Sequence, residues 1–156
     1  MIAVGDMDIH FRVAQENDVV ILLELIREFY VVDRHVFDAE RTRVALEGLM
    51  CDPAFGYVWL IEADGEAIGY VALTLGYSLE YFGRDAFIDE IYIRENYRGR
   101  GIGGRTLQFV EVQARRLGVH ALHLEVEREN EQAHALYGKQ GFEEQPSRFM
   151  SKWIAS

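Results

Sequence analysis

The hydrophobic pattern of the first third of the chain predicts one strand and two helices. Weak alternation of apolar and polar residues from Ile9 to Val13 is typical of a strand. From Glu16 to Tyr30 the apolar residues recur at the spacing of a helix. Asp38 is a suitable N-cap for a second helix, which is expected to end before Pro53. The chain should therefore begin with the order β-α-α.

Three runs of apolar residues follow, and each of them predicts a strand. The runs Tyr57–Ala63 and Ala67–Leu75 are joined by Asp64-Gly65, a pair typical of a tight hairpin. After a turn at Glu80–Arg84, the run Phe87–Ile93 predicts the last of the three strands. Because the connections are short, we expect these strands to be antiparallel neighbours.

A glycine-rich loop separates the third of these strands from a long helix. Apolar residues at helical spacing run from Leu107 to Leu117, and Gly118 is expected to end this helix. The short apolar run Ala121–Val126 then predicts another strand. Strand, loop, helix and strand together predict one right-handed β-α-β crossover.

The C-terminal part predicts a further helix and two closing strands. Asn130 is expected to cap the helix and Gly141 to end it. Phe142 and the segment Arg148–Ile154 can supply the strands. The whole order predicts one α+β domain over residues 1–156, in which four helices flank a central mixed, mostly antiparallel sheet of six to seven strands.

The net charge, the apolar runs and the single cysteine of the chain argue against several kinds of partner and location. A net charge of −10 argues against nucleic-acid binding, which needs a basic face. No apolar run reaches the length of a membrane span, and the N-terminus lacks the pattern of a signal peptide, so we expect no membrane partner. The lone Cys51 is better explained as a structural residue than as a nucleophile, and it fits a reducing cytoplasm.

The glycine-rich loop is the strongest chemical signal in the chain. Glycines leave the main chain uncovered where a helix begins, and the amides and dipole of that helix end attract an anion. Arginines add positive charge to the same short segment, against an acidic background. Together these residues predict a phosphate site, formed by Arg98, Gly99, Arg100, Gly101, Ile102, Gly103, Gly104 and Arg105.

Two nucleotide-binding motifs partly fit the same glycines. Gly99, Gly101 and Gly104 have the spacing of a dinucleotide fingerprint, with Glu125 as the later acidic residue. The loop is also one residue from a P-loop, since Arg105 stands where lysine is expected. The dinucleotide fingerprint is weakened because Arg94–Arg98 intervene after the strand and because helices and antiparallel strands come first. The P-loop is weakened because the planar arginine is a poor substitute for lysine and because no following strand ends in an obvious magnesium-binding aspartate.

A longer pattern resembles the GNAT family of N-acetyltransferases. Its first part is Arg98-x-x-Gly101-x-Gly103 after a strand ending Ile91-Tyr92-Ile93. Its second part is Asn130-x-x-Ala133-x-x-Leu136-Tyr137-x-x-x-Gly141-Phe142. The resemblance covers residues 87–142, and the sequence around Asp89–Gly99 is similar to the polyamine acetyltransferase branch.

The resemblance implies acetyl-coenzyme A as cosubstrate, bound between two strands that splay apart. These strands are Phe87–Ile93 and Ala121–Val126. The pantetheine arm is expected along the main chain of Ile91–Ile93, and the diphosphate on the amides of Gly99–Gly104. The implied cofactor-binding residues are Ile91, Tyr92, Ile93, Arg98, Gly99, Arg100, Gly101, Ile102, Gly103, Gly104, Arg105, Asn130 and Ala133.

The same resemblance implies the catalytic groups. Tyr137 is expected to donate a proton to the departing thiolate, although its apolar neighbours also fit a core tyrosine. A carboxylate is expected to take the proton of the attacking amine. Asp89 is the slightly better match and Glu90 its rival, because strand alternation lets only one of them face the cleft, and Glu125 is a third candidate.

The sequence therefore predicts direct acetyl transfer, within a ternary complex, to a primary amine that is a small molecule or a lysine side chain. Acidic residues near the expected acceptor side favour a small cationic amine, namely Glu28, Asp33, Glu80 and Asp85. Tyr30 and His35 could also line that pocket.

We expect no metal site, because the histidines are not suitably placed. A homodimer through the C-terminal strands is a further expectation. The alternatives are a non-catalytic acyl-coenzyme A-binding regulatory module and a dinucleotide-binding domain.

Overall fold

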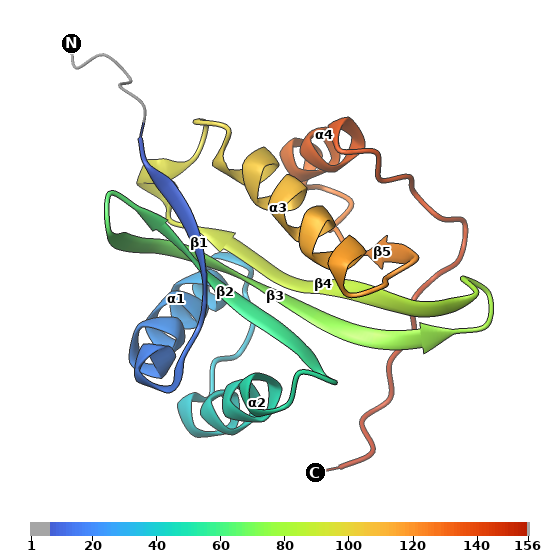
Figure 1. Cartoon of the computed structure of the whole chain (residues 1–156), viewed down its shortest axis with the longest axis horizontal. Helices are drawn as coiled ribbons and strands as arrows, with labels where there is room; N and C mark the ends of the chain where they lie inside the picture. Colours follow the sequence, from blue (N-terminus) through green and yellow to red (C-terminus); the bar gives the residue numbers. More distant parts are fainter. Residues whose placement is uncertain (1–6, 156) are drawn as a thin grey trace. The chain divides into compact units, whose positions relative to one another are not determined.

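A five-stranded sheet organises the first part of the chain (Figure 1). The computed structural model describes residues 7–155, which fall into one unit ending at Glu125 and another beginning at Val126. The strands are β1 (Ile9–Val13), β2 (Gly56–Ala63), β3 (Glu66–Ser78), β4 (Gly83–Ile93) and β5 (Ala121–His123). The helices of this unit are α1 (Val19–Val32), α2 (Ala39–Cys51) and α3 (Ile102–Arg116), with short 3₁₀ turns at Glu16–Asp18 and Glu95–Tyr97.

The sheet has the strand order β1-β2-β3-β4-β5. The first three pairs of neighbours are antiparallel, and β4 pairs with β5 in parallel, as the crossover through α3 requires. The parallel pairing is short, since it joins only Asp85–Phe87 to Ala121–His123. Among the described residues, Ile88–Ile93 therefore has no strand partner on the β5 side of β4. This is the edge on which the pantetheine arm is expected.

Helices cover both faces of the sheet in this unit. Figure 1 shows α1 and α2 on one face and α3 on the opposite face. The face toward α1 and α2 buries a cluster that includes Leu22, Leu25, Leu60 and Tyr70. On the other face, Ile102 of α3 packs with residues of β1, β2 and β3. Alternate residues of the central strands thus enter two separate cores.

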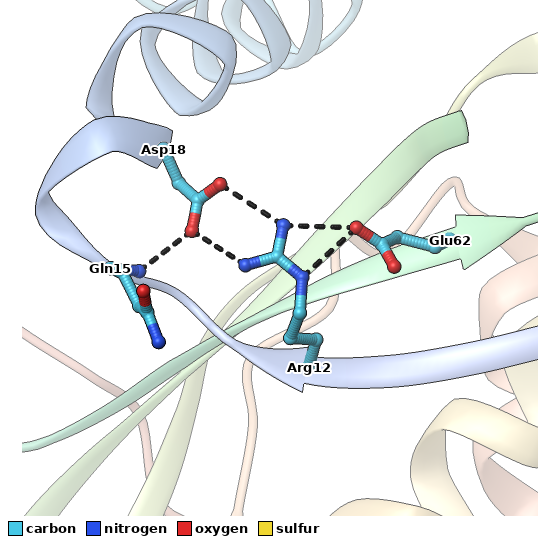
Figure 2. A network of polar contacts seen from close by, with 4 residues as sticks. All are labelled: Arg12, Gln15, Asp18 and Glu62. Carbon is cyan, nitrogen blue, oxygen red and sulfur yellow. Dashed lines mark hydrogen bonds and ion pairs between the residues drawn. The ribbon is translucent and has the colours of Figure 1, made fainter. Parts of the chain in front are cut away.

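A charged network fixes the turn between β1 and α1 (Figure 2). The Arg12 guanidinium donates to both oxygens of Asp18, at 2.8 and 3.0 Å, and to Oε1 of Glu62 at 2.9 and 3.0 Å. The main-chain amide of Gln15 donates to Asp18 as well, at 2.7 Å. The network holds the predicted helix start at Glu16 in a separate 3₁₀ turn, after which α1 begins at Val19.

The second unit contains α4 (Glu131–Lys139). Asn130 caps it, since its Oδ1 accepts a hydrogen bond from the Ala133 amide at 3.1 Å. Gly141, with φ of 88°, follows the end of the helix in the left-handed conformation. Four helices, the mixed sheet and the predicted caps at Asp38 and Asn130 are thus confirmed.

The prediction of six to seven strands is wrong, because the described sheet has five. The two closing strands expected at Phe142 and Arg148–Ile154 are not formed, and the described residues after Gln140 are irregular. The pattern of side chains within one segment shows only that the segment could form a strand. A strand also needs a neighbouring strand for its main-chain hydrogen bonds, which the pattern does not specify. In Arg148–Ile154 the apolar side chains remain exposed, including Phe149 and Trp153.

Two strand ends also differ from the prediction. The strand β4 begins at Gly83, within the segment expected to turn, because β3 extends to Ser78 and pairs with Gly83 there. At the other edge, β5 ends at His123 rather than at Val126. Among the described residues, no helix is long and apolar enough to cross a membrane.

Candidate active site

The loop before α3 depends on glycine for its backbone conformation. Gly99 has φ of 74° and Gly101 has φ of 78°, both in the left-handed region that most side chains avoid. No described atom crowds the position of a Cβ at either residue. Backbone conformation, and not tight packing, is therefore the reason for these two glycines. The loop consequently presents its main chain without covering side chains.

The N-terminus of α3 has no cap from its own chain. The N-cap is Gly101, which lacks a side chain, and the amide of Arg105 makes the first helical bond to the Gly101 carbonyl at 3.1 Å. In α2, by contrast, Asp38 accepts from the amide of Arg41 at 3.1 Å. By helix geometry, the amides of residues 101–104 have no helical acceptor. An external anion such as a diphosphate fits this end of α3.

The predicted arginines of the loop have different surroundings. Arg98 donates from Nε to the carbonyl of Ile93 at 2.8 Å, and its guanidinium lies 5.5 Å from the centre of the Tyr92 ring. Arg100 lies over the ring of Tyr97 at 5.7 Å. Arg98 therefore ties the loop to the end of β4, whereas the exposed Arg100 keeps its charge near the helix end.

A β-bulge lies in β4 at the predicted catalytic carboxylates. The register pairs Glu90 with Ala72 and Ile88 with Leu73, so that Asp89 is the extra residue. A bulge interrupts the strict alternation of side chains along a strand. The expectation that alternation lets only one of the two acids face a cleft therefore does not apply here. Asp89 is exposed and Glu90 is partly buried.

Two tyrosines hold the carboxylate of Glu90. The hydroxyl of Tyr30, from α1, donates to Oε2 at 2.7 Å. The hydroxyl of Tyr70, from β3, donates to Oε1 at 3.0 Å. Tyr70 is only 1% exposed, which makes it a fixed part of the core. Each oxygen of Glu90 thus receives one hydrogen bond from an uncharged donor.

These surroundings shift the pKa of Glu90 upward. Burial is the largest cause, and the negative charge of Asp89 adds to it. The hydrogen bonds from Tyr30 and Tyr70 and the nearby His35 act in the opposite direction. Burial also raises the pKa of Asp89, although contact with solvent screens this effect.

The two tyrosines themselves stay protonated. Burial is the largest cause that raises the pKa of Tyr30 and of Tyr70, and the neighbouring Glu90 raises both further. They are therefore donors at any physiological pH. Glu90 is the group of this cluster that can gain or lose a proton.

Glu28 is occupied within the protein. Arg94 contacts both of its oxygens, at 3.0 and 3.1 Å, and also reaches Glu24 at 2.9 Å. The hydroxyl of Tyr92 donates to Glu28 at 3.2 Å. Glu28 is therefore less available to a cationic acceptor than the sequence predicts.

Two further acids from the predicted acceptor side have histidine partners. Asp33 lies 2.7 Å from Nε2 of His35, and Asp85 lies 3.1 Å from Nε2 of His123. By contrast, Asp89 and Glu90 form no ion pair among the residues that the structure describes. The uncompensated negative charge in this region of the sheet therefore lies on β4.

In the second unit, Tyr137 lies on α4. It is partly buried, and its ring centre lies 6.0 Å from that of Phe142. The amide of Phe142 donates to the carbonyl of Tyr137 at 3.1 Å, which closes the chain at the end of the helix. Asn130 and Ala133 are joined by the cap hydrogen bond, so Asn130 has a structural role in addition to any contact with a cosubstrate.

Residues 20–142 match the acetyltransferase (GNAT) family. The chain belongs to this family. The mixed sheet differs from the parallel sheet of a dinucleotide-binding fold. The prediction of an acetyl-coenzyme A-dependent acetyltransferase is confirmed.

The chain is also similar to individual proteins along most of its length. The chain is 30% identical to the thialysine N-epsilon-acetyltransferase of Mus musculus over 136 residues, which cover 81% of this chain and 79% of the mouse protein. It is 34% identical to the integron cassette protein HFX_CASS3 from the Cole Harbour Salt Marsh metagenome, with a TM-score of 0.84 over 94% of this chain and 91% of that one.

A GNAT-like fold also occurs in a structure solved with the cosubstrate. An acetyltransferase from Clostridium acetobutylicum with acetyl-CoA gives a TM-score of 0.76 at 17% identity, over 93% of this chain and 96% of that one. At this identity the likeness concerns the fold. Among the described residues, no group of three or more His, Cys, Asp or Glu side chains could hold a metal ion.

Sequence reasoning missed the partners of Glu90 in this GNAT chain. The sequence places Tyr30 near the acceptor pocket but does not predict its hydrogen bond to Glu90 of β4. Tyr70 lies in an apolar run and has the pattern of an ordinary core residue, so no local signal distinguishes it. Glu125, the third candidate base, is exposed just beyond β5.

Proposed function

We propose that the protein transfers the acetyl group of acetyl-coenzyme A directly to a primary amine within a ternary complex, and that the acceptor is a small cationic amine. The observation that carries the proposal is the pair of uncompensated acids on β4, with Glu90 held by Tyr30 and Tyr70. The mouse relative is a thialysine N-epsilon-acetyltransferase by name, which supports an amine at the end of a short chain as acceptor.

The acceptor must lose a proton before it can attack. An alkylammonium of pKa about 10.4 is neutral only about once in a thousand at pH 7, which costs about 4 kcal/mol. We assign Glu90 as the base that takes this proton, because its raised pKa brings its basicity closer to that of the amine. Asp89, more exposed, is assigned to attract and hold the cation.

The chemical step joins the amine nitrogen to the acetyl carbon and breaks the bond from carbon to sulfur. One proton of the ammonium passes to Glu90 before the attack, and the departing thiolate takes a proton from Tyr137. The second proton that the nitrogen loses as the amide forms restores the Tyr137 hydroxyl, and the proton on Glu90 passes to solvent. A main-chain amide near Ile91 polarises the thioester carbonyl, as an oxyanion hole does. No covalent intermediate on the enzyme is involved, since Cys51 is exposed at the end of α2.

The cosubstrate is held mainly by the main chain. The amides of residues 101–104 receive the diphosphate, and Arg100 and Arg105 add positive charge. The pantetheine arm follows the open edge of β4 at Ile91–Ile93. Asn130 and Ala133 remain proposed contacts from the start of α4.

A single domain over residues 1–156, a cytoplasmic location and a homodimer remain predictions of the sequence. Limited proteolysis and differential scanning calorimetry test whether the two units unfold together. Size-exclusion chromatography with light scattering tests the dimer.

The proposed chemistry is tested with a panel of amines, with thiol release as the readout. Small polyamines, amino sugars, thialysine and neutral amines of similar size are compared at equal concentration. Initial rates with both substrates varied should give intersecting lines, as a ternary complex requires. Parallel lines would contradict the ternary complex. Equal rates with neutral and cationic amines would contradict the preference for a cationic acceptor.

Variants then assign the residues. Glu90→Gln and Tyr137→Phe should lower turnover, whereas Asp89→Asn should mainly raise the KM of the amine. The Cys51→Ser variant is the control and should match the wild type. Tight binding of coenzyme A without turnover of any amine would instead indicate a non-catalytic binding module.

A further inference from the structure

The hydroxyls of Tyr30 and Tyr70 reach Glu90 from two different elements and take one carboxylate oxygen each. We propose that both tyrosines are positioning residues, which fix the Glu90 carboxylate and set the pH above which it can accept the proton of the acceptor amine. This inference rests on the proposed function of Glu90 as base. It assigns to Tyr30 and Tyr70 a role in the reaction that the sequence does not indicate.

Both rings are held by their neighbours, so the hydroxyls are already in place. The ring of Tyr30 contacts those of Phe29, His35 and Phe37, with centres 5.7 to 6.1 Å apart. Tyr70 is buried, and its ring lies 6.4 Å from that of Tyr92. Little side-chain entropy is left to lose when such donors bind a carboxylate.

Four groups among the described residues act on the charge of the Glu90 carboxylate, and their effects differ in sign. Tyr30 from α1 and Tyr70 from β3 stabilise the ionised form by donating hydrogen bonds. His35, which follows α1, acts in the same direction. Asp89, beside Glu90 on β4, favours the protonated form. Removal of either hydroxyl should therefore make Glu90 hold its proton to a higher pH.

The two tyrosines should differ in the size of their effect. Tyr30 is partly exposed, so in Tyr30→Phe a water molecule can replace the lost hydroxyl. In Tyr70→Phe the site is closed to solvent, and the oxygen of Glu90 loses its donor outright. The upward shift in the pKa of Glu90 should therefore be larger in Tyr70→Phe than in Tyr30→Phe. A general loss of packing does not predict this order.

The first experiment measures kcat/KM against pH, from about pH 5 to about pH 9, with acetyl-coenzyme A and thialysine. Tyr30→Phe should move the acid limb upward by about half a pH unit and Tyr70→Phe by about one unit or more. The rate at the alkaline plateau and the KM for acetyl-coenzyme A should stay near the wild-type values. The ionisation of the acceptor is the same throughout, so it does not contribute to the differences.

The second experiment needs no acceptor. The side-chain carboxyl carbons of glutamate are followed by ¹³C NMR as pH changes, and the signal lost in Glu90→Gln identifies Glu90. The midpoint of this signal should shift upward in both tyrosine variants. Tyr77→Phe is the matched control, because Tyr77 lies on the same strand as Tyr70 but is 80% exposed. It should change neither the rate profile nor the midpoint.

The outcomes separate the inference from the proposed function. If Glu90→Gln keeps wild-type turnover and its acid limb, Glu90 is not the base and both claims fall. If Glu90→Gln loses turnover but neither tyrosine variant moves the limb or the NMR midpoint, only the positioning role is overturned. Should Tyr70→Phe not fold, as judged by circular dichroism, Tyr30→Phe alone decides between these results.

Discussion

Two carboxylates of this acetyltransferase lie in partly enclosed sites but have opposite kinds of partner. Asp18 is 8% exposed and accepts two hydrogen bonds from the guanidinium of Arg12, which lowers its pKa (Figure 2). Glu90 accepts its hydrogen bonds from two uncharged tyrosines, and burial raises its pKa. One charge is compensated and the other is not.

The difference indicates what each group can do. A carboxylate bound to a guanidinium stays ionised and holds chain segments together, here β1, the turn before α1 and β2. A carboxylate held by neutral donors is fixed in place yet keeps its affinity for a proton. The charge of the donors thus distinguishes the structural acid Asp18 from the proposed base Glu90.

The largest expected effect is on turnover. Glu90→Gln removes the proton acceptor but can keep a hydrogen bond from a tyrosine, so kcat should fall by about 100-fold or more. Asp18→Asn, an equally conservative change, should leave kcat within about twofold of the wild type. Both are measured by thiol release below the melting temperature of either variant. A similar loss in both variants would contradict the division into catalytic and structural acids.

The next effect is on stability. Asp18→Asn leaves the Arg12 guanidinium with one anionic partner in place of two and should lower the free energy of unfolding by about 2 kcal/mol. Because the side chain of Arg12 is 42% exposed, water can solvate it, and the cost stays below that of a fully buried pair. In a thermal melt this corresponds to a drop of about 5 °C. An unchanged melt would mean that solvent already replaces the ion pair.

These contrasts also show how far the sequence predicts the molecule. The strand Ile9–Val13, the caps at Asp38 and Asn130 and the glycine loop follow from local chemistry, and the structure confirms them as structural elements. The closing strand at Arg148–Ile154 is wrong, because strand formation depends on a partner that the segment itself does not specify.

The glycine-rich loop proposed to bind the diphosphate is one continuous segment, whereas the cluster around Glu90 is assembled from distant segments. Tyr30, Tyr70 and Glu90 are separated by 60 and 20 residues along the chain. The bulge at Asp89 depends on the register between β3 and β4, which no local pattern determines. The sequence therefore indicates candidate acids, but not which of them is held by neutral donors.

The two acids should also give opposite dependences of stability on pH. The pKa of Glu90 is raised, so its contribution is present below its unfolded value of 4.5 and is lost as pH rises through the folded value. Glu90→Gln should therefore become more stable relative to the wild type between about pH 5 and about pH 8, by about 1 kcal/mol.

The pKa of Asp18 is lowered, mainly by the hydrogen bond from Arg12, so its contribution is present above its unfolded value of 3.8 and is lost as pH falls through the folded value. The penalty of Asp18→Asn should thus stay constant over the range in which the penalty of Glu90→Gln falls. Melts of the three proteins in matched buffers measure both trends. Parallel trends in the two variants would show that the donors do not determine the shifts.

The smallest expected effect concerns the outer part of the Arg12 network. Glu62 accepts from Arg12 through Oε1 alone, whereas Asp18 uses both oxygens and also binds the amide of Gln15. Glu62→Gln should therefore lower the free energy of unfolding by only about 0.5 kcal/mol, since a neutral amide oxygen can still accept from the guanidinium.

The double variant Asp18→Asn/Glu62→Gln then measures how strongly the two acids depend on each other. If both compete for the same charge, the double variant costs more than the sum, because Arg12 then has no anion left in this network. A sum of the single effects would instead show that solvent compensates Arg12, and that the structural acid of this comparison is Asp18 alone.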